Sequence, residues 1–361
     1  MYSRIKREIS KRLTKEAKNK FKRALWKSGV GHIFRTVASD KVKFEKIFKQ
    51  APASIMIYPT NLCNALCSFC AYPTNTDPKK IMPNEIAFKA IDDLIAMGGG
   101  TIADFTTNLG DPLVDPNLAD KLAYAKSKGV RITRFFTNGI LLDRTGLIEK
   151  VAPHLDELHV SLPGLDRKNY LEVFRVDKAE KVGRGLIKLG EHKARTGKPG
   201  RVFIEIRASR ALEVVMQDEG MRHLKPYFDT GVFELGFVRT TYENWSGVIS
   251  DKEMIGDMKL IRRPPVKKDI PCGLLFFNPG VLPDGHMRAC SCWYLTTNYD
   301  KLTLPKITER PLADILFGDE HRKIMLDWTD GDLPPPCSGC SNYEPAFFSL
   351  KDVVKMATSI R

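Results

Sequence analysis

The sequence predicts an α/β fold, a partial (β/α)6 barrel with a small C-terminal domain and a basic helical N-terminal extension. Three observations support it. Short β-type runs alternate with amphipathic helical patterns from residue 53 onward. Polar and glycine-rich segments follow the β-type runs. At about residue 256 a proline-interrupted linker, "RRPPVKKD", precedes five of the eight cysteines. We therefore expect three parts, residues 1–52, 53–255 and 256–361.

The N-terminal extension carries most of the charge. Residues 1–50 contain 16 Lys and Arg against 4 Asp and Glu, a net +12 of the chain's +14. Apolar residues recur among the cations of residues 3–27, as in a basic amphipathic helix. Three interpretations stay open: residues 1–30 bind an anionic membrane surface, form a solvated helix that caps the barrel, or contact nucleic acid. Nucleic acid is disfavoured because aromatic residues suited to base stacking are sparse there.

The start of the chain lacks the apolar core of a secretory signal, and no apolar run reaches the roughly 18 residues of a membrane span. We expect a cytoplasmic protein, which the basic helix can hold on the inner face of a membrane.

Six β-type runs and the helical patterns between them define the expected barrel. The runs cover residues 54–59, 101–107, 131–137, 156–162, 201–207 and 232–239, and the clearest amphipathic segments cover 84–98, 116–129 and 181–197. In such a barrel, the loops that follow the strands form the active face.

The loop after the first run, "CNALCSFC", crowds Cys63, Cys67 and Cys70 into eight residues. Three thiolates can hold three irons of a 4Fe-4S cube and leave the fourth iron open to a small chelating ligand. The alternative is a zinc knuckle. Structural zinc needs four ligands, and no fourth Cys or His follows nearby.

The spacing of these three cysteines, with the aromatic Phe69 before the third, resembles the signature of the radical S-adenosylmethionine (SAM) enzymes. The resemblance implies that the open iron binds the amino and carboxylate groups of SAM. One electron, from a partner such as flavodoxin or ferredoxin, would then cleave the sulfonium. The resulting 5′-deoxyadenosyl radical would abstract hydrogen from a substrate.

The resemblance extends to "NLGDPLVDP" after the second run, where the family carries Gly-Gly-Glu-Pro. It implies that Gly110 and Asp111 contact the methionine amino group of SAM. Leu109 replaces the first glycine of that pattern, and Asp111 is one methylene shorter than glutamate. An aspartate still accepts a charge-assisted hydrogen bond. The alternative is an ordinary Gly-Asp-Pro turn.

Three more residues resemble family positions that line the SAM pocket, and a fourth, an arginine, is expected to reach the same pocket. They are Thr137, Asn138, Ser161 and Arg207. An ordinary Asn-Gly turn, a capping serine and a structural arginine are the alternatives. The arginine ends the fifth run and is expected to pair with the SAM carboxylate.

The C-terminal cysteines resemble the SPASM/twitch extension of radical SAM enzymes. In its shortened twitch form, the resemblance implies one auxiliary 4Fe-4S cluster bound by Cys272, Cys290, Cys337 and Cys340. The segment "PDGHMRAC" is expected to form a hairpin, and residues 307–324 a helix before the final pair. A zinc ribbon is the alternative.

Cys292 is left over once two clusters are assigned. It can be a small buried residue, a substitute ligand, or a thiol that returns a hydrogen atom to a substrate radical. In the last case the reaction is a redox-neutral epimerisation.

A fully ligated auxiliary cluster suits electron transfer, and so favours dehydrogenation of a small polar substrate, a sugar or cyclitol, free or lipid-linked. A peptide-modifying maturase is the alternative, although the N-terminal segment is short for a leader-peptide domain. A metal-stabilised nucleic-acid-binding module is the non-enzymatic alternative.

Overall fold

The computed structural model describes residues 48–262, 268, 270–291 and 300–346. Within these ranges, no helix combines the length and the apolar character needed to cross a bilayer. Residues 1–30 and Cys292 lie outside them, so the predictions on the basic helix and on the leftover thiol stay predictions.

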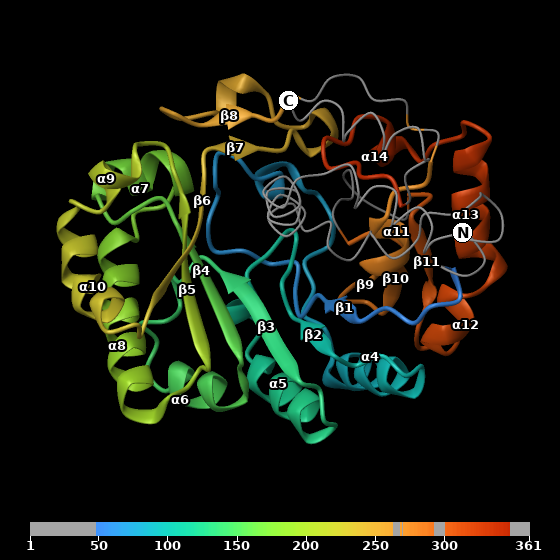
Figure 1. The fold of residues 1–361 in the computed structure, drawn as a ribbon, viewed down its shortest axis with the longest axis horizontal. Helices are drawn as coiled ribbons and strands as arrows, with labels where there is room; N and C mark the ends of the chain where they lie inside the picture. Colours follow the sequence, from blue (N-terminus) through green and yellow to red (C-terminus); the bar gives the residue numbers. More distant parts are fainter. Residues whose placement is uncertain (1–47, 263–267, 269, 292–299, 347–361) are drawn as a thin grey trace, which may run out of the picture.

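The predicted strands and helices of the barrel are present. The strands are β1 (Ser54–Ile57), β2 (Ile102–Asp104), β3 (Ile132–Thr137), β4 (Glu157–Leu162), β5 (Arg201–Arg207) and β6 (Glu234–Arg239). The helices are α4 (Asn84–Ala96), α5 (Leu118–Ser127), α6 (Leu147–Val151), α7 (Arg167–Phe174), α8 (Ala179–Thr196), α9 (Leu212–Val215) and α10 (Glu219–Asp229). Figure 1 shows α4, α5, α6 and α8 along the outer side of the curved sheet.

The remaining elements are shorter. They are β7 (Thr241–Tyr242), β8 (Lys259–Leu260), α11 (Leu274–Phe277), β9 (Gly280–Val281), β10 (His286–Arg288), β11 (Thr303–Lys306), α12 (Leu312–Leu316), α13 (Asp319–Thr329) and α14 (Pro335–Ser338). The expected hairpin is confirmed, because β9 pairs antiparallel with β10. The helix expected over 307–324 is two helices, α12 and α13, which meet at Gly318.

One sheet joins the barrel to the C-terminal part. Its strand order is β11-β10-β9-β1-β2-β3-β4-β5-β6, and β1 to β6 pair in parallel. On the other side of β1, β9 also pairs in parallel. The segment that composition marks as a second domain therefore continues the barrel sheet.

Period-two alternation decides which side chains reach the barrel interior. In β4, alternate residues from Leu158 to Leu162 are buried in the core. The other residues of β4, Glu157, His159 and Ser161, are half-buried on the opposite, inner face. Because successive side chains of a strand point to opposite faces, each barrel strand contributes one row to the outer core and one to the interior.

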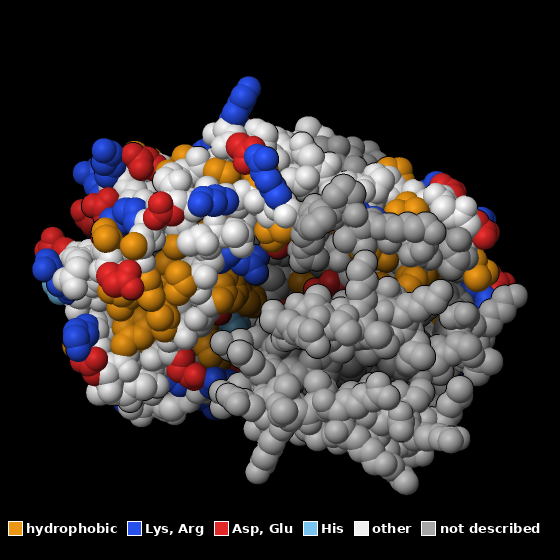
Figure 2. All heavy atoms as spheres, turned by 45° about the horizontal axis from the view of Figure 1, so that its top comes forward, with side chains coloured by type: hydrophobic (Ala, Val, Ile, Leu, Met, Phe, Trp, Pro, Cys, Tyr) orange, Lys and Arg blue, Asp and Glu red, His pale blue; other side chains and the backbone are white. Residues whose placement is uncertain are grey.

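The sixth β/α unit lacks its helix. Residues 240–262, which follow β6, contain β7, β8 and two short 3-10 helices but no α-helix. The outward side chains Leu235 and Val238 are correspondingly 42% and 39% exposed. Figure 2 shows hydrophobic side chains gathered over one part of the surface, with Lys, Arg, Asp and Glu around them.

Candidate active site

The three-cysteine loop follows β1 and rests on the end of α7. Leu66 N donates to Phe174 O at 3.1 Å, and Ser68 N donates to Val173 O at 2.8 Å. The last carbonyls of a helix have no partner within it, so they are free to accept from another segment. The turn of the loop is closed by Cys70 N, which donates to Cys67 O at 3.1 Å.

The thiols of Cys63, Cys67 and Cys70 share a buried environment that disfavours bare thiolates. Burial, followed by the charge of Asp111, raises the pKa of Cys63 to about 12. Burial also raises the pKa of Cys70 to about 11, and burial together with the other two thiols raises that of Cys67. A cationic metal cluster removes the repulsion between thiolates, so this donor set fits such a group.

Asp111 holds the turn after β3. Its carboxylate accepts from Thr137 Oγ1 at 2.8 and 3.0 Å, from Asn138 N at 2.7 Å and from Leu113 N at 3.0 Å. The single hydroxyl hydrogen of Thr137 is shared between the two carboxylate oxygens, so three donors occupy a carboxylate that offers about four acceptor positions. The structure thus gives Asp111 a positioning role, and its predicted contact with the methionine amino group stays a prediction.

Asn138 reaches the cysteine loop itself. Its Nδ2 lies 2.7 Å from Asn64 Oδ1 and 3.8 Å from Cys63 Sγ. Asp111 fixes the backbone N–H of the same residue, so carboxylate, asparagine and cysteine form one connected set. Gly110 sits beside this set because a Cβ there would lie 2.9 Å from Thr60 O and 3.0 Å from Leu62 O. A side chain at that position has no room.

Arg207 lies on the interior face next to the cysteine loop. Its guanidinium donates to Ser161 Oγ at 3.2 Å and lies over the rings of Phe69 and Phe237, at 5.8 and 4.8 Å. Its charge lowers the pKa of Cys67 and Cys70 against the larger effect of burial. Among the described residues no carboxylate pairs with it, and its buried Nε makes no hydrogen bond. A guanidinium in this state is suited to bind an anionic group.

Other buried polar atoms around the loop also lack partners among the described residues. They are Asn64 Nδ2, Ser68 Oγ, Thr107 Oγ1 and Tyr170 OH. Buried polar groups are nearly always hydrogen-bonded in native proteins. These atoms therefore fit a polar ligand next to the cysteines, as SAM is expected to be.

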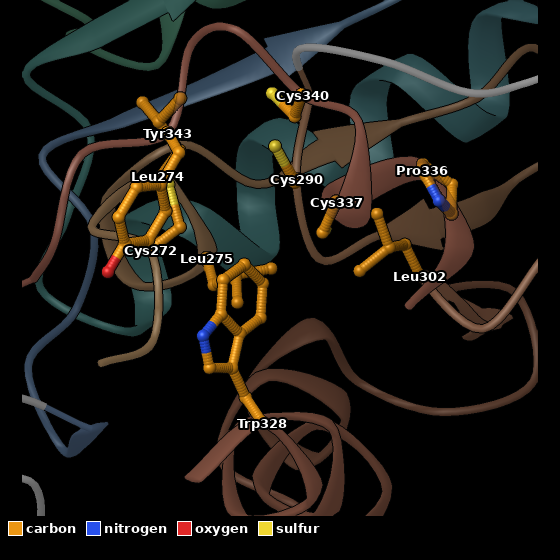
Figure 3. Close-up of a pocket in the computed structure, with 10 residues that line it drawn as sticks. All are labelled: Cys272, Leu274, Leu275, Cys290, Leu302, Trp328, Pro336, Cys337, Cys340 and Tyr343. Carbon is orange, nitrogen blue, oxygen red and sulfur yellow. The ribbon is translucent and has the colours of Figure 1, made fainter. Parts of the chain in front are cut away.

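The four C-terminal cysteines surround one pocket. Cys272, Cys290, Cys337 and Cys340 line it together with Trp328, Tyr343 and aliphatic side chains (Figure 3). Burial, followed by the charge of Cys290, raises the pKa of Cys272 to about 12. Within the ranges that the structure describes, no three His, Cys, Asp or Glu side chains are arranged to hold a single ion. Four thiols around one pocket are a donor set that fits an iron–sulfur cluster.

Lys268 supports this pocket, and no sequence pattern pointed to it. Its Nζ donates to the carbonyl oxygens of Cys337, Ser338 and Cys340 at 2.7, 2.9 and 3.0 Å. All three ammonium hydrogens are thus directed at the C-x-x-C turn. Lys268 lies in the proline-rich stretch that composition marks as a linker. Only the fold brings its ammonium group to the cysteines.

Tyr58 connects the two cysteine regions. Its hydroxyl accepts from Asn108 Nδ2 at 2.9 Å and donates to Ser291 O, next to Cys290, at 2.5 Å. Tyr58 lies in the first β-type run, and the sequence pattern assigned it no role. Its partner Ser291 is 233 residues away in the chain, so no local pattern could predict the bond.

Comparisons with known proteins agree with this picture. Residues 57–202 match the model of the radical SAM superfamily. A GTP 3′,8-cyclase of Chlorobaculum tepidum is 33% identical over 37% of this chain and 40% of its own length. A dTDP-4-amino-4,6-dideoxy-D-glucose ammonia-lyase of Streptomyces venezuelae is 28% identical over 45% of this chain and 35% of its own. The chain thus spans less than half of the curated relatives it matches.

Two solved structures share the fold. BtrN in complex with AdoMet and 2-DOIA superposes with a TM-score of 0.52 at 14% identity, over 81% of this chain and 94% of that one. Streptococcus suis SuiB bound to its precursor peptide SuiA superposes with a TM-score of 0.54 at 15% identity, over 83% and 77%. The three-cysteine loop and strands β2 to β4 lie within the stretch that matches the radical SAM superfamily model, so this part of the chain is similar to a radical SAM domain.

Proposed function

We propose that this protein is a radical SAM enzyme that dehydrogenates a small polar substrate, a sugar or a cyclitol. In this proposal Cys63, Cys67 and Cys70 hold a 4Fe-4S cluster whose fourth iron binds SAM. The bound group supplies a 5′-deoxyadenosyl radical when reduced by a flavodoxin or ferredoxin. The observation that carries the proposal is the set of three half-buried thiols in one loop, beside an arginine with no carboxylate partner among the described residues.

Residues around the loop have defined tasks in this proposal. Arg207 binds the SAM carboxylate, with Ser161 fixing its guanidinium. Asn138 positions the loop through Asn64, and Asp111 holds Thr137 and Asn138 in place. Phe69 covers one side of the arginine. The orphaned polar atoms around the cysteines supply hydrogen bonds to the rest of SAM.

We further propose a second 4Fe-4S cluster bound by Cys272, Cys290, Cys337 and Cys340 in a twitch-type domain. Support comes from their arrangement around one pocket and from the cationic Lys268 against two of them. A cluster with four protein ligands has no open iron for substrate, so its use is to accept an electron. This fits a reaction in which a substrate radical must lose one electron.

Two comparisons support a small-molecule substrate. The names of the two curated relatives given above specify GTP and a dTDP-linked sugar, both small polar molecules. Peptide maturation and redox-neutral epimerisation remain the alternative activities within the superfamily. The likeness to SuiB concerns the fold.

The test uses anaerobically reconstituted full-length protein and two matched variants. Wild type should hold about eight irons, four per cluster. Replacing Cys63, Cys67 and Cys70 together by Ala should leave about four irons and abolish SAM cleavage. Replacing the four C-terminal cysteines should also remove about four irons, with the 5′-deoxyadenosine assay still positive. SAM cleavage by the first variant would overturn the proposal.

A further inference from the structure

A stack of rings crosses the inner face of the barrel below Arg207. In register on three neighbouring strands lie Phe136, His159 and Phe203. The His159 ring is parallel to both phenylalanines, with centroid distances of 4.1 and 4.6 Å and angles of 14° and 15°. Both faces of the imidazole are therefore covered, and only its edge is available to a ligand.

A carboxylate holds one nitrogen of this edge. His159 Nδ1 lies 2.7 Å from Oε1 of Glu205, a side chain only 2% exposed. The other carboxylate oxygen accepts from Phe237 N at 2.5 Å. An ionised carboxylate only accepts, so it favours the tautomer with the proton on Nδ1; in that tautomer of the neutral ring, Nε2 keeps its lone pair and can accept.

The backbone of β6 is shaped around this carboxylate. Ile204 pairs with Leu235 and Ile206 pairs with Val238, so two residues of β6, Gly236 and Phe237, oppose the single Glu205. This is a β-bulge, a feature enriched beside active sites. Glycine is required at the first bulge position because a Cβ there would collide with the Glu205 carboxylate.

The second nitrogen lies toward Glu157, at the start of β4. His159 Nε2 lies 3.9 Å from Glu157 Oε2, too far for a hydrogen bond. It donates to or accepts from no described residue, and the side chain keeps 14% of its surface exposed. His159 precedes Ser161 by two residues along β4, so it lies about 7 Å deeper in the barrel than Ser161, the partner of Arg207.

We propose that His159 Nε2 accepts the proton lost from a substrate hydroxyl when the carbon that bears it is oxidised. The inference rests on the proposed function and deepens it. Oxidation of a CH–OH group to a carbonyl removes one hydrogen atom, one proton and one electron. The C–H bond breaks with its hydrogen passing to the SAM-derived radical. The O–H bond breaks with its proton passing to Nε2, and the electron passes to an oxidised iron–sulfur cluster.

Glu205 is a positioning residue in this scheme. Its negative charge stabilises the imidazolium that forms and keeps the ring in the tautomer that exposes the Nε2 lone pair. Proton transfer by a placed side chain typically contributes 10²- to 10⁴-fold. If the His159–Glu205 pair were purely structural, it would only hold β4, β5 and β6 together. Replacing either residue would then leave the yield of oxidised product unchanged.

The first experiment needs no substrate. Full-length reconstituted protein is treated with diethyl pyrocarbonate, and modified histidines are located by mass spectrometry, with the exposed His223 as internal reference. The proposal expects His159 to be modified, more slowly than His223. Side-chain nitrogen NMR should assign its neutral form as the Nδ1–H tautomer. An unmodified His159 beside a modified His223, or the opposite tautomer, overturns the proposal.

The second experiment follows product yield with scyllo-inositol and dTDP-4-amino-4,6-dideoxy-D-glucose as cyclitol and sugar probes. His159→Gln should lower the ratio of oxidised product to 5′-deoxyadenosine about 100-fold. Glu205→Gln should lower it less, and the control His223→Gln should leave it unchanged. A His159→Gln ratio within twofold of wild type overturns the inference. If wild type fails to cleave SAM or to oxidise either probe, the proposed function fails, and the labelling result still decides the orientation of His159.

Discussion

The indole Nε1 of Trp245 donates a hydrogen bond of 2.9 Å to the carbonyl oxygen of Phe69, inside the three-cysteine loop. The next residue, Ser246, donates from Oγ to Pro336 O at 2.7 Å, beside Cys337. One turn thus touches both cysteine regions. Trp245 and Ser246 have φ of 47° and 53°, a left-handed conformation uncommon for residues other than glycine.

Substitutions at Ser246 separate the strain of this turn from its hydrogen bond. Ser246→Ala and Ser246→Gly both lose the bond to Pro336 O, but only glycine relieves the left-handed backbone. We expect Ser246→Gly to be more stable than Ser246→Ala by about 1 kcal/mol in denaturant unfolding. At Ser127 in α5, where helix propensity dominates, the order should reverse. Equal stabilities at Ser246 would show that the turn is unstrained.

Replacing Lys268 should shift the proposed C-terminal cluster toward lower reduction potential. A reduced cluster is more negative, so a cation against the C-x-x-C turn stabilises it. Lys268→Met keeps the bulk and removes both the charge and three hydrogen bonds. The midpoint is read by a redox titration followed by EPR. Lys301→Met removes an exposed lysine paired with Asp332 and should leave the midpoint unchanged. A Lys268→Met midpoint equal to wild type argues against this role.

Asp111 allows a choice between its observed role and the predicted SAM contact. Asp111→Asn turns one acceptor into a donor against a network of donors, and should cost about 1–3 kcal/mol of unfolding free energy. Asp111→Glu restores the residue usual in the family but adds a methylene to a site that is 2% exposed. Overpacking of this kind costs about 1–3 kcal/mol. A stable Asp111→Glu protein with tighter SAM binding by calorimetry would favour direct contact instead.

His321 should make the fold sensitive to acid. Burial lowers its pKa from the usual 6.5, against the effect of two carbonyl acceptors, Leu316 O and Leu275 O. The unfolded chain therefore binds a proton before the folded one, so stability present above about pH 6.5 is lost as the pH falls. Between pH 7.5 and 5.5, wild type should lose more unfolding free energy than His321→Gln. Parallel losses would contradict the assignment.

The basic N-terminal segment is tested by deletion of residues 1–30. If it binds anionic lipid, full-length protein should sediment with anionic vesicles at low salt and be released at high salt, since screening weakens such attraction. The deletion variant should stay in solution under both conditions. Neutral vesicles serve as the control. Equal behaviour of the two proteins would reject the membrane interpretation.

The sequence predicted what depends on local pattern. Alternation located the barrel strands, and amphipathic spacing located helices α4, α5 and α8, because burial of one face dictates those periods. The cysteine loop could be recognised from the sequence because its three cysteines lie close together in the chain. The hairpin β9–β10 was marked by its Pro-Asp-Gly turn.

The missed features depend on contacts between distant segments. The role of Lys268 requires the fold to bring a linker residue to a turn about 70 positions away. The pairing of His159 with Glu205 requires a bulge in β6, which strand propensity cannot reveal. The hydrogen bonds that Asp111 accepts from Thr137, Asn138 and Leu113 were not predicted, because a motif shows which residue is present and not where its carboxylate points.

The pairing of β9 with β1 also limits where this protein can be truncated. β1 lies inside the sheet, with β2 on one side and β9 on the other. A shortened protein that ends at residue 255, where composition suggests a boundary, would leave one side of β1 without its partner. An unpaired, apolar strand next to the cysteine loop would pair with other chains and promote aggregation. The barrel and its C-terminal extension are therefore best expressed, exchanged or engineered as one piece.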